Sequence, residues 1–112
     1  MNIEWKGSAY RIKKCATDLL SVGDLIEDDE EDSWDLMGRD IRLKSTFLYC
    51  DFNQAISNAP QELKKPLLEL ANKLFHYIEE LDNAVKIRNI SLTQSRYEDA
   101  ALVLQEVMSV IP

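Results

Sequence analysis

The stretch from Gln61 to Arg88, QELKKPLLELANKLFHYIEELDNAVKIR, decides the fold of this chain. Its large apolar residues recur at steps of three and four positions, the spacing that gathers side chains on one face of an α-helix. These residues are Leu63, Leu67, Leu70, Leu74, Ile78, Leu81 and Val85. Such a helix extends for about 40 Å at about 1.5 Å per residue. A chain of 112 residues buries it only if its neighbours are also long and nearly parallel to it.

Three further segments carry the same spacing. We predict helices from about Ser8 to Leu25, from Ser33 as N-cap to Ser57, and from Ser91 or Thr93 to the C-terminal end. In the first segment the predicted core positions are Ile12, Cys15 or Ala16, Leu19, Val22 and Ile26. In the second they are Trp34, Met37, Ile41, Leu48, Phe52 and Ala55, and the stripe is widened by Leu36, Leu43, Phe47 and Cys50. In the fourth they are Tyr97, Ala101, Leu104, Met108 and Ile111, flanked by Ala100, Val103, Val107 and Val110. Short connections make successive helices antiparallel. Residues 1–112 are therefore predicted to form one all-α domain, an up-down-up-down four-helix bundle.

The net charge of −7 comes mainly from one run of six adjacent acids, Glu27 to Asp32. Without this run the chain carries 14 acids and 13 bases, from totals of 20 and 13. Because like charges repel, we expect the run to be a solvated connector, with contact to a basic partner as the alternative. It lacks the alternating ligands and central Gly of an EF-hand. The acidic balance argues against nucleic-acid binding, and no apolar stretch approaches the roughly 20 residues that span a bilayer.

The sequence contains no recognisable set of catalytic, cofactor-binding or metal-binding residues. His76 is the only His, and we expect it at the surface of the third helix, because metal sites in helical bundles need several His and carboxylate ligands. Cys15 and Cys50 form no CxxC pair. If the first two helices pair antiparallel around the acidic run, Cys15 lies beside about position 44 and too far from Cys50 for an easy disulfide. Core packing of the two cysteines is therefore the favoured interpretation, and a disulfide is the alternative. We therefore predict no enzyme activity, no cofactor and no metal.

Basic residues gather at one end of the predicted bundle. Both the first and the third helix begin there, while the acidic run lies at the opposite end, so the charge is predicted to be polarised along the bundle. These bases are the candidate partner-binding residues, Lys6, Arg11, Lys13, Lys14, Lys64 and Lys65. Trp34 and Tyr49 are alternative contacts, because aromatic residues often anchor interfaces, although Trp34 also fits a place in the core. Ordinary solvation of these charges is the competing interpretation.

Two stretches resemble a known family. The first is Ser33-Trp34 followed by RDIRLKSTFLYCDFNQAI from Arg39 to Ile56. The second is Lys64-Lys65 through Leu70, Lys73-Leu74-Phe75, Ile78, and LDNAVK from Leu81 to Lys86. Their order and spacing are similar to PsbQ, the extrinsic oxygen-evolving subunit of photosystem II, and to its PsbQ-like relatives. The resemblance covers about residues 33–111, and its family fold is also a four-helix up-down bundle.

The resemblance implies a non-catalytic accessory subunit in the chloroplast thylakoid lumen, peripheral to the membrane and separated from its transit peptide. Plant PsbQ has a Pro-rich N-terminal arm and a basic character, and this chain departs from both. These departures favour a PsbQ-like lumenal subunit of the chloroplast NAD(P)H dehydrogenase-like complex, which supports cyclic electron flow around photosystem I. The alternative is an extrinsic photosystem II subunit that helps to retain Ca²⁺ and Cl⁻.

Overall fold

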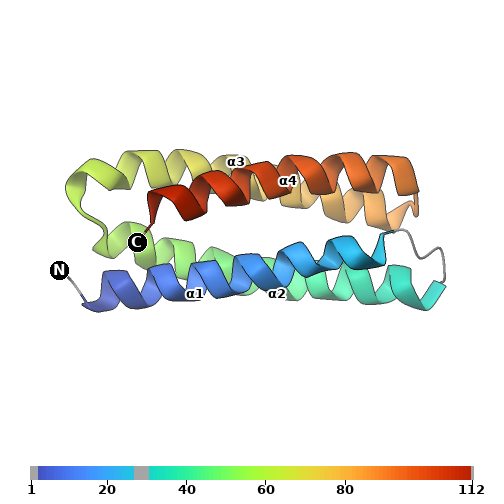
Figure 1. Cartoon of the computed structure of the whole chain (residues 1–112), viewed down its shortest axis with the longest axis horizontal. Helices are drawn as coiled ribbons and strands as arrows, with labels where there is room; N and C mark the ends of the chain where they lie inside the picture. Colours follow the sequence, from blue (N-terminus) through green and yellow to red (C-terminus); the bar gives the residue numbers. More distant parts are fainter. Residues whose placement is uncertain (1–2, 27–30, 112) are drawn as a thin grey trace.

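The computed structural model describes residues 3–26 and 31–111. Figure 1 shows four antiparallel helices, α1 (Ile3–Leu20), α2 (Glu31–Asn58), α3 (Gln61–Lys86) and α4 (Ile90–Val110). A short 3-10 helix, η1 (Ser21–Leu25), follows α1. The Cα atoms extend over 46 × 19 × 17 Å, as expected for long helices that lie side by side. The predicted all-α, up-down-up-down bundle is confirmed.

The helix α3 is the best predicted element. It begins at Gln61, directly after Pro60, and ends two residues before the predicted Arg88. Pro66 lies inside the helix without ending it. The buried part of its stripe consists of Leu67, Ala71, Leu74, Ile78, Leu81, Ala84 and Val85. Leu63 and Leu70, which lie on either side of the fully buried Leu67, are half-buried.

The predicted apolar face of α2 is too wide. Six positions are buried as predicted, Trp34, Met37, Ile41, Leu48, Phe52 and Ala55. The four residues expected to widen this stripe, Leu36, Leu43, Phe47 and Cys50, are exposed instead. Because α2 packs between α1 and α3, its outer surface faces away from both neighbours. That part of the prediction is wrong.

The starts of three helices also differ from the prediction, and the first α-helix ends at Leu20, with the 3-10 helix η1 continuing to the predicted Leu25. The first helix begins at Ile3 rather than near Ser8, which brings Trp5 into the core with 2% of its surface exposed. The second begins by Glu31, so Ser33 lies inside the helix and is not its N-cap. Glu31 and Asp32 thus belong to α2, while residues 27–30 of the predicted connector lie outside the described residues.

The start of α4 is set by Asn89 rather than by Ser91 or Thr93. The Asn89 side chain accepts a hydrogen bond from the Leu92 backbone N–H at 2.9 Å, which satisfies one of the amides that have no partner within the helix. Arg88, just before it, has a left-handed φ of 55° that reverses the chain between α3 and α4. Asn is a strong N-cap residue, so this boundary could have been read from the sequence.

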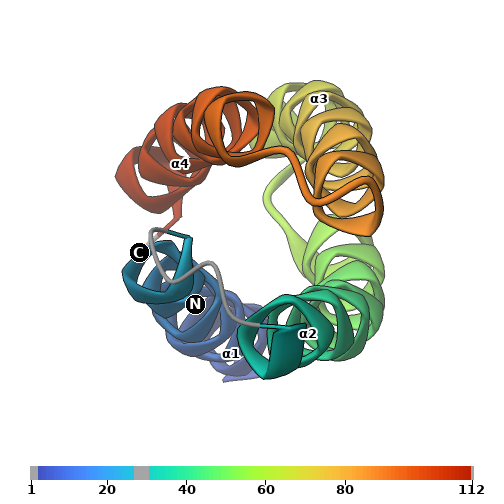
Figure 2. The same cartoon turned by 90° about the vertical axis from the view of Figure 1, so that its right-hand side faces the viewer.

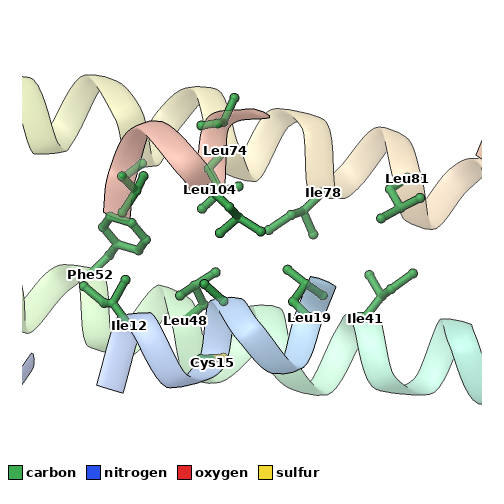
Figure 3. Packing of buried hydrophobic residues seen from close by; sticks show 14 of the residues in the cluster. Ile12, Cys15, Leu19, Ile41, Leu48, Phe52, Leu74, Ile78, Leu81 and Leu104 are labelled. Atoms are coloured by element: carbon green, nitrogen blue, oxygen red, sulfur yellow. The ribbon is translucent and has the colours of Figure 1, made fainter. Parts of the chain in front are cut away.

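The core fills the centre of the ring of helices seen end-on in Figure 2. Figure 3 shows side chains from all four helices pointing into it, among them Ile12, Leu19, Leu48, Phe52, Leu74, Ile78 and Leu104. On α4 the buried stripe is rotated from the predicted one. Ala100, Val103, Leu104 and Val107 are its centre, whereas Tyr97, Ala101 and Met108 are half-buried. No helix in the described part of the chain is long and apolar enough to cross a membrane.

Candidate docking surfaces

The helices α1 and α3 begin at the same end of the bundle (Figure 1), and the predicted basic residues lie within the first twelve residues of α1 and the first five of α3. We call this set the basic end: Lys6, Arg11, Lys13, Lys14, Lys64 and Lys65. Lys6, Lys14 and Lys65 are exposed, and Lys13 is half-buried. No carboxylate among the described residues forms an ion pair with any of these four lysines. Their charges are therefore available to attract an acidic surface.

Two members of the basic end are engaged within the bundle. The Arg11 guanidinium donates to Asp51 Oδ1 at 3.1 Å, to Gln54 Oε1 at 2.8 Å and to Ser8 Oγ at 3.1 Å, so it ties α1 to α2. Lys64 Nζ donates to the Ser57 carbonyl at 3.0 Å, near the C-terminus of α2. A lysine at that position also offsets the negative end of the helix dipole. Arg11 and Lys64 are thus weaker candidates for partner contacts than the other four.

The two aromatic candidates lie in different environments. Trp34 is 2% exposed and belongs to the core, so its expected core position is confirmed and it offers no open surface as an anchor. Tyr49 is 57% exposed and packs edge-on against Phe75, with ring centroids 5.4 Å apart. Phe75 in turn meets the buried Phe52 at 5.9 Å. Tyr49, Phe75 and Phe52 therefore form a continuous series of ring contacts from the surface between α2 and α3 to the core.

A second basic cluster, which the sequence analysis missed, lies near the opposite end of the bundle. It lines a hollow of about 420 Å³ between α2 and α3, formed by Trp34, Asp35, Gly38, Arg39, Arg42, Val85, Lys86 and Arg88. The end that was predicted to be acidic therefore also carries cations, and four of them, Arg39, Arg42, Lys86 and Arg88, line this hollow beside Asp35. The spacing of Arg39 and Arg42, three residues apart on a helix, was the available signal, since such residues share a face.

The cysteines are both free thiols, so the alternative of a disulfide is not what the structure holds. Cys15 is buried and its Sγ donates to the Lys44 carbonyl at 3.2 Å, which confirms the predicted pairing with position 44. Core packing is thus right for Cys15 and wrong for the exposed Cys50. Burial raises the pKa of the Cys15 thiol above its ordinary value of 9.0; nearby Asp51 and Asp18 add to this and Lys44 opposes it.

The other groups that carry chemistry are scattered. His76 is exposed, as predicted, and lies beside Tyr77 with ring centroids 5.4 Å apart. Within the described ranges, no group of three or more His, Cys, Asp or Glu residues is placed to hold a metal ion. The features with the clearest capacity for recognition are therefore the basic end and the surface between α2 and α3.

Comparison with known proteins gives a consistent result. A family model for PsbQ, described as oxygen evolving enhancer protein 3, matches residues 1–112. The chain is 46% identical, over 96% of its length, to photosynthetic NDH subunit of lumenal location 3, chloroplastic, from Arabidopsis thaliana. It is 34% identical over 91% of its length to oxygen-evolving enhancer protein 3-1 of Arabidopsis thaliana, and 32% identical over 91% to oxygen-evolving enhancer protein 3 of Spinacia oleracea. The chain spans about half the length of these curated relatives, 48%, 44% and 43% respectively.

Proposed function

The chain belongs to the PsbQ family, and from this membership we propose that it is a non-catalytic accessory subunit on the lumenal side of the chloroplast NAD(P)H dehydrogenase-like (NDH) complex. In this role it stabilises or helps to assemble the complex, and so supports cyclic electron flow around photosystem I. It works in the thylakoid lumen, at the membrane surface.

The observation that carries this proposal is the difference in similarity between two kinds of relative. The chain shares 46% identity with a lumenal NDH subunit, against 34% or 32% with the oxygen-evolving enhancer proteins compared above. These alignments cover nearly the same part of the chain, 96% and 91%, so unequal coverage does not produce the difference. The acidic net charge of −7 favours the same assignment, because the resemblance described above implies a basic character for plant PsbQ. Surfaces that dock on different partners are expected to differ in charge.

Docking through the basic end follows from its chemistry. Lys6, Lys13 and Lys14 lie on α1 and Lys65 lies near the start of α3, and no carboxylate in the described part of the chain forms an ion pair with them. Such charges speed the encounter with an acidic surface and fix its orientation. At physiological salt their reach is about 8 Å, so they act on a partner that is already close. Arg11 supports the same end from within by joining α1 to α2.

A second candidate function is an extrinsic subunit of photosystem II that helps to retain Ca²⁺ and Cl⁻. The description of the family model, oxygen evolving enhancer protein 3, favours it. In that role the bundle shields the ion site without supplying ligands. Both functions involve docking on a large thylakoid complex, so the complex that the chain joins separates them.

The deciding experiment is co-migration. Thylakoids are solubilised gently, the complexes are separated on a native gel, and the gel is probed for this chain. We expect it in the very large assembly that contains the NDH complex and photosystem I. Migration with photosystem II instead would favour the second function, and migration with neither would reject both.

The basic end is tested by charge reversal in the same assay. Lys13→Glu with Lys14→Glu changes the charge by four units at the basic end, and we expect it to reduce co-migration without unfolding the bundle. The matched control is Lys73→Glu with Arg96→Glu, which makes the same change on α3 and α4. These controls break one exposed ion pair, Lys73–Glu106, and one partly exposed pair within α4, Arg96–Asp99, and such pairs contribute little stability. Equal assembly of both double variants would remove the basic end from the proposal.

A further inference from the structure

We propose that the groove between α2 and α3 is a second docking site, which binds a segment of a partner protein with apolar side chains at one end and carboxylates at the other. The inference rests on the proposed function, because it describes the chemistry of a partner that this function requires. The groove consists of the 420 Å³ basic hollow and an adjoining hollow of about 370 Å³, and Arg42 lines both. The helices α2 and α3 are direct neighbours along this side of the bundle (Figure 2).

One half of the groove is apolar. Ile41 and Ile78 lie at its base, and Tyr49 and Phe75 form an aromatic wall where their rings meet edge-on at 5.4 Å. Tyr49 remains 57% exposed in the chain alone, so a partner side chain that covers it removes apolar surface from water. An exposed aromatic residue beside a hollow is the typical place for an interface anchor.

The polar groups of the apolar half do not compete with such an anchor. The hydroxyls of Ser45 and Thr46 both donate to the Arg42 carbonyl, at 3.1 and 2.9 Å, so they are already satisfied within α2. Glu79 is an exposed carboxylate that also lines this half. Its charge repels an acidic side chain, and therefore directs the carboxylates of a bound segment towards the other half.

The other half carries excess positive charge. Arg42 and Lys86 share one carboxylate, Asp82, at 3.3 and 3.2 Å, and Arg39 pairs with no carboxylate among the described residues. Arg88 and Asp35, which pair at 3.5 Å, also line this half, so four cations and two carboxylates leave a net charge of +2 before any partner binds. Gly38 lets the Arg42 guanidinium lie close to the α2 backbone, because a Cβ there would be 3.1 Å from Arg42 Nη1. Guanidinium groups bind carboxylates with two parallel hydrogen bonds, which makes them suitable readers of Asp and Glu side chains.

The dimensions favour a protein segment over a small anion. From Trp34 to Cys50 the groove follows α2 for about 24 Å at about 1.5 Å per residue, enough for about seven residues in an extended conformation. The cations line the end of this path nearer Trp34, and two of them, Arg42 and Lys86, already share Asp82. Asp82 would also repel a compact dianion placed between Arg42 and Lys86. Separate monovalent carboxylates along a chain meet the same cations with less repulsion.

The test uses the full chain and a synthetic seven-residue peptide, Phe-Leu-Ser-Gly-Glu-Asp-Glu, together with its reversed sequence. The ¹⁵N-labelled chain is titrated with each peptide, and amide shifts are mapped by NMR. We expect at least one orientation to bind, with shifts in both halves of the groove and an affinity that falls as salt rises. A peptide with Gln and Asn in place of the acids should bind at least tenfold more weakly.

Matched variants separate the groove from general electrostatic attraction. Arg39→Gln should weaken binding about tenfold, the loss of one charge-assisted contact. Arg96→Gln removes an arginine from α4, and should leave binding unchanged. Tyr49→Ala should weaken binding several-fold, whereas Tyr10→Ala, which truncates a 68% exposed tyrosine on α1, should not. Arg39 and Tyr10 are both exposed, and neither forms an ion pair with another described residue.

Four outcomes of the peptide titrations would overturn the inference. They are no shifts with either peptide, shifts confined to the basic end, equal binding by Arg39→Gln and Arg96→Gln, and full competition by inorganic phosphate at equal concentration. A dimer of the chain that is lost in Arg39→Gln would identify a second copy as the occupant and also reject it. None of these results depends on the co-migration assay, so the inference and the proposed function fail separately.

Discussion

The close approach of Gly23 to Tyr97 allows a test of the contact that holds α4 against the end of α1. Tyr97, on α4, donates its hydroxyl to the Leu20 carbonyl at 2.7 Å, at the point where α1 ends and η1 begins. The Gly23 backbone lies beneath the tyrosine ring. A Cβ at position 23 would stand 2.6 Å from both Cζ and Oη of Tyr97, closer than atoms in contact approach. Gly23→Ala therefore forces the ring to move.

The size of the effect follows from three contributions to the free energy of unfolding. Ala in place of Gly at a normal φ stabilises by about 0.4–1 kcal/mol, because the unfolded chain loses freedom. Overpacking against the ring costs about 1–3 kcal/mol, and loss of the bond to Leu20 costs about 1 kcal/mol. The net expectation is a destabilisation of about 2 kcal/mol. For a domain of this size that lowers Tm by about 8 °C.

A double-mutant cycle supplies the assay. Urea and thermal unfolding, followed by circular dichroism, are measured for the parent chain, Gly23→Ala, Tyr97→Leu and the double variant. Without the ring, the alanine should be neutral or stabilising by about 0.5 kcal/mol, so the coupling between the positions is about 2 kcal/mol. If Gly23→Ala costs the same with and without the ring, or stabilises the parent chain, the reasoning from this contact is refuted.

Three further predictions concern the core, the thiols and a helix cap. Phe52→Ala should lower the free energy of unfolding in urea by about 3–5 kcal/mol because Phe52 is 1% exposed, whereas Phe47→Ala, at a site 54% exposed, should change it by less than about 0.5 kcal/mol. Cys50 should react with a maleimide in the native chain much faster than the buried Cys15. The raised pKa of Cys15 means that the folded state holds the thiol proton more tightly than the unfolded chain does, so the protonated thiol contributes fully to stability below about pH 9. This contribution is lost as pH rises through the raised pKa. Unfolding titrations at increasing pH should show the loss, and Cys15→Ala should make the loss smaller. Asn89→Ala should cost about 1 kcal/mol in the same assay, through the lost N-cap bond to α4, and an unchanged Tm would contradict the capping role.

Much of the fold followed from one-dimensional patterns. A stripe such as that of α3 has one way to be buried, because its residues share a face only in a helix and that face needs long neighbours. The pairing of Cys15 with position 44 followed from antiparallel geometry alone, and the bond to the Lys44 carbonyl bears it out. The stretches at residues 33–56 and 64–86 also carried the family resemblance, since order and spacing are properties of the sequence.

Other features depended on which neighbours each helix acquired. Leu43 and Phe47 are as apolar as Leu48, and only the positions of α1 and α3 around α2 decide that they face outwards. The sequence alone does not show that Arg11 has a partner. In the folded chain Arg11 bonds α1 to α2, because packing brings Asp51 and Gln54 within hydrogen-bond distance.

The sequence by itself determined the helix count, the antiparallel order, most of the buried stripe and the family. These are local properties, set by residue spacing and by the short connections between helices. Only the tertiary structure decided which charges stay open and which surfaces form grooves. Arg39, Arg42 and Lys86 are more than 40 positions apart at their extremes, and they share one hollow because α2 and α3 pack side by side there. That juxtaposition arises from helix packing, so no periodicity along the chain contains it.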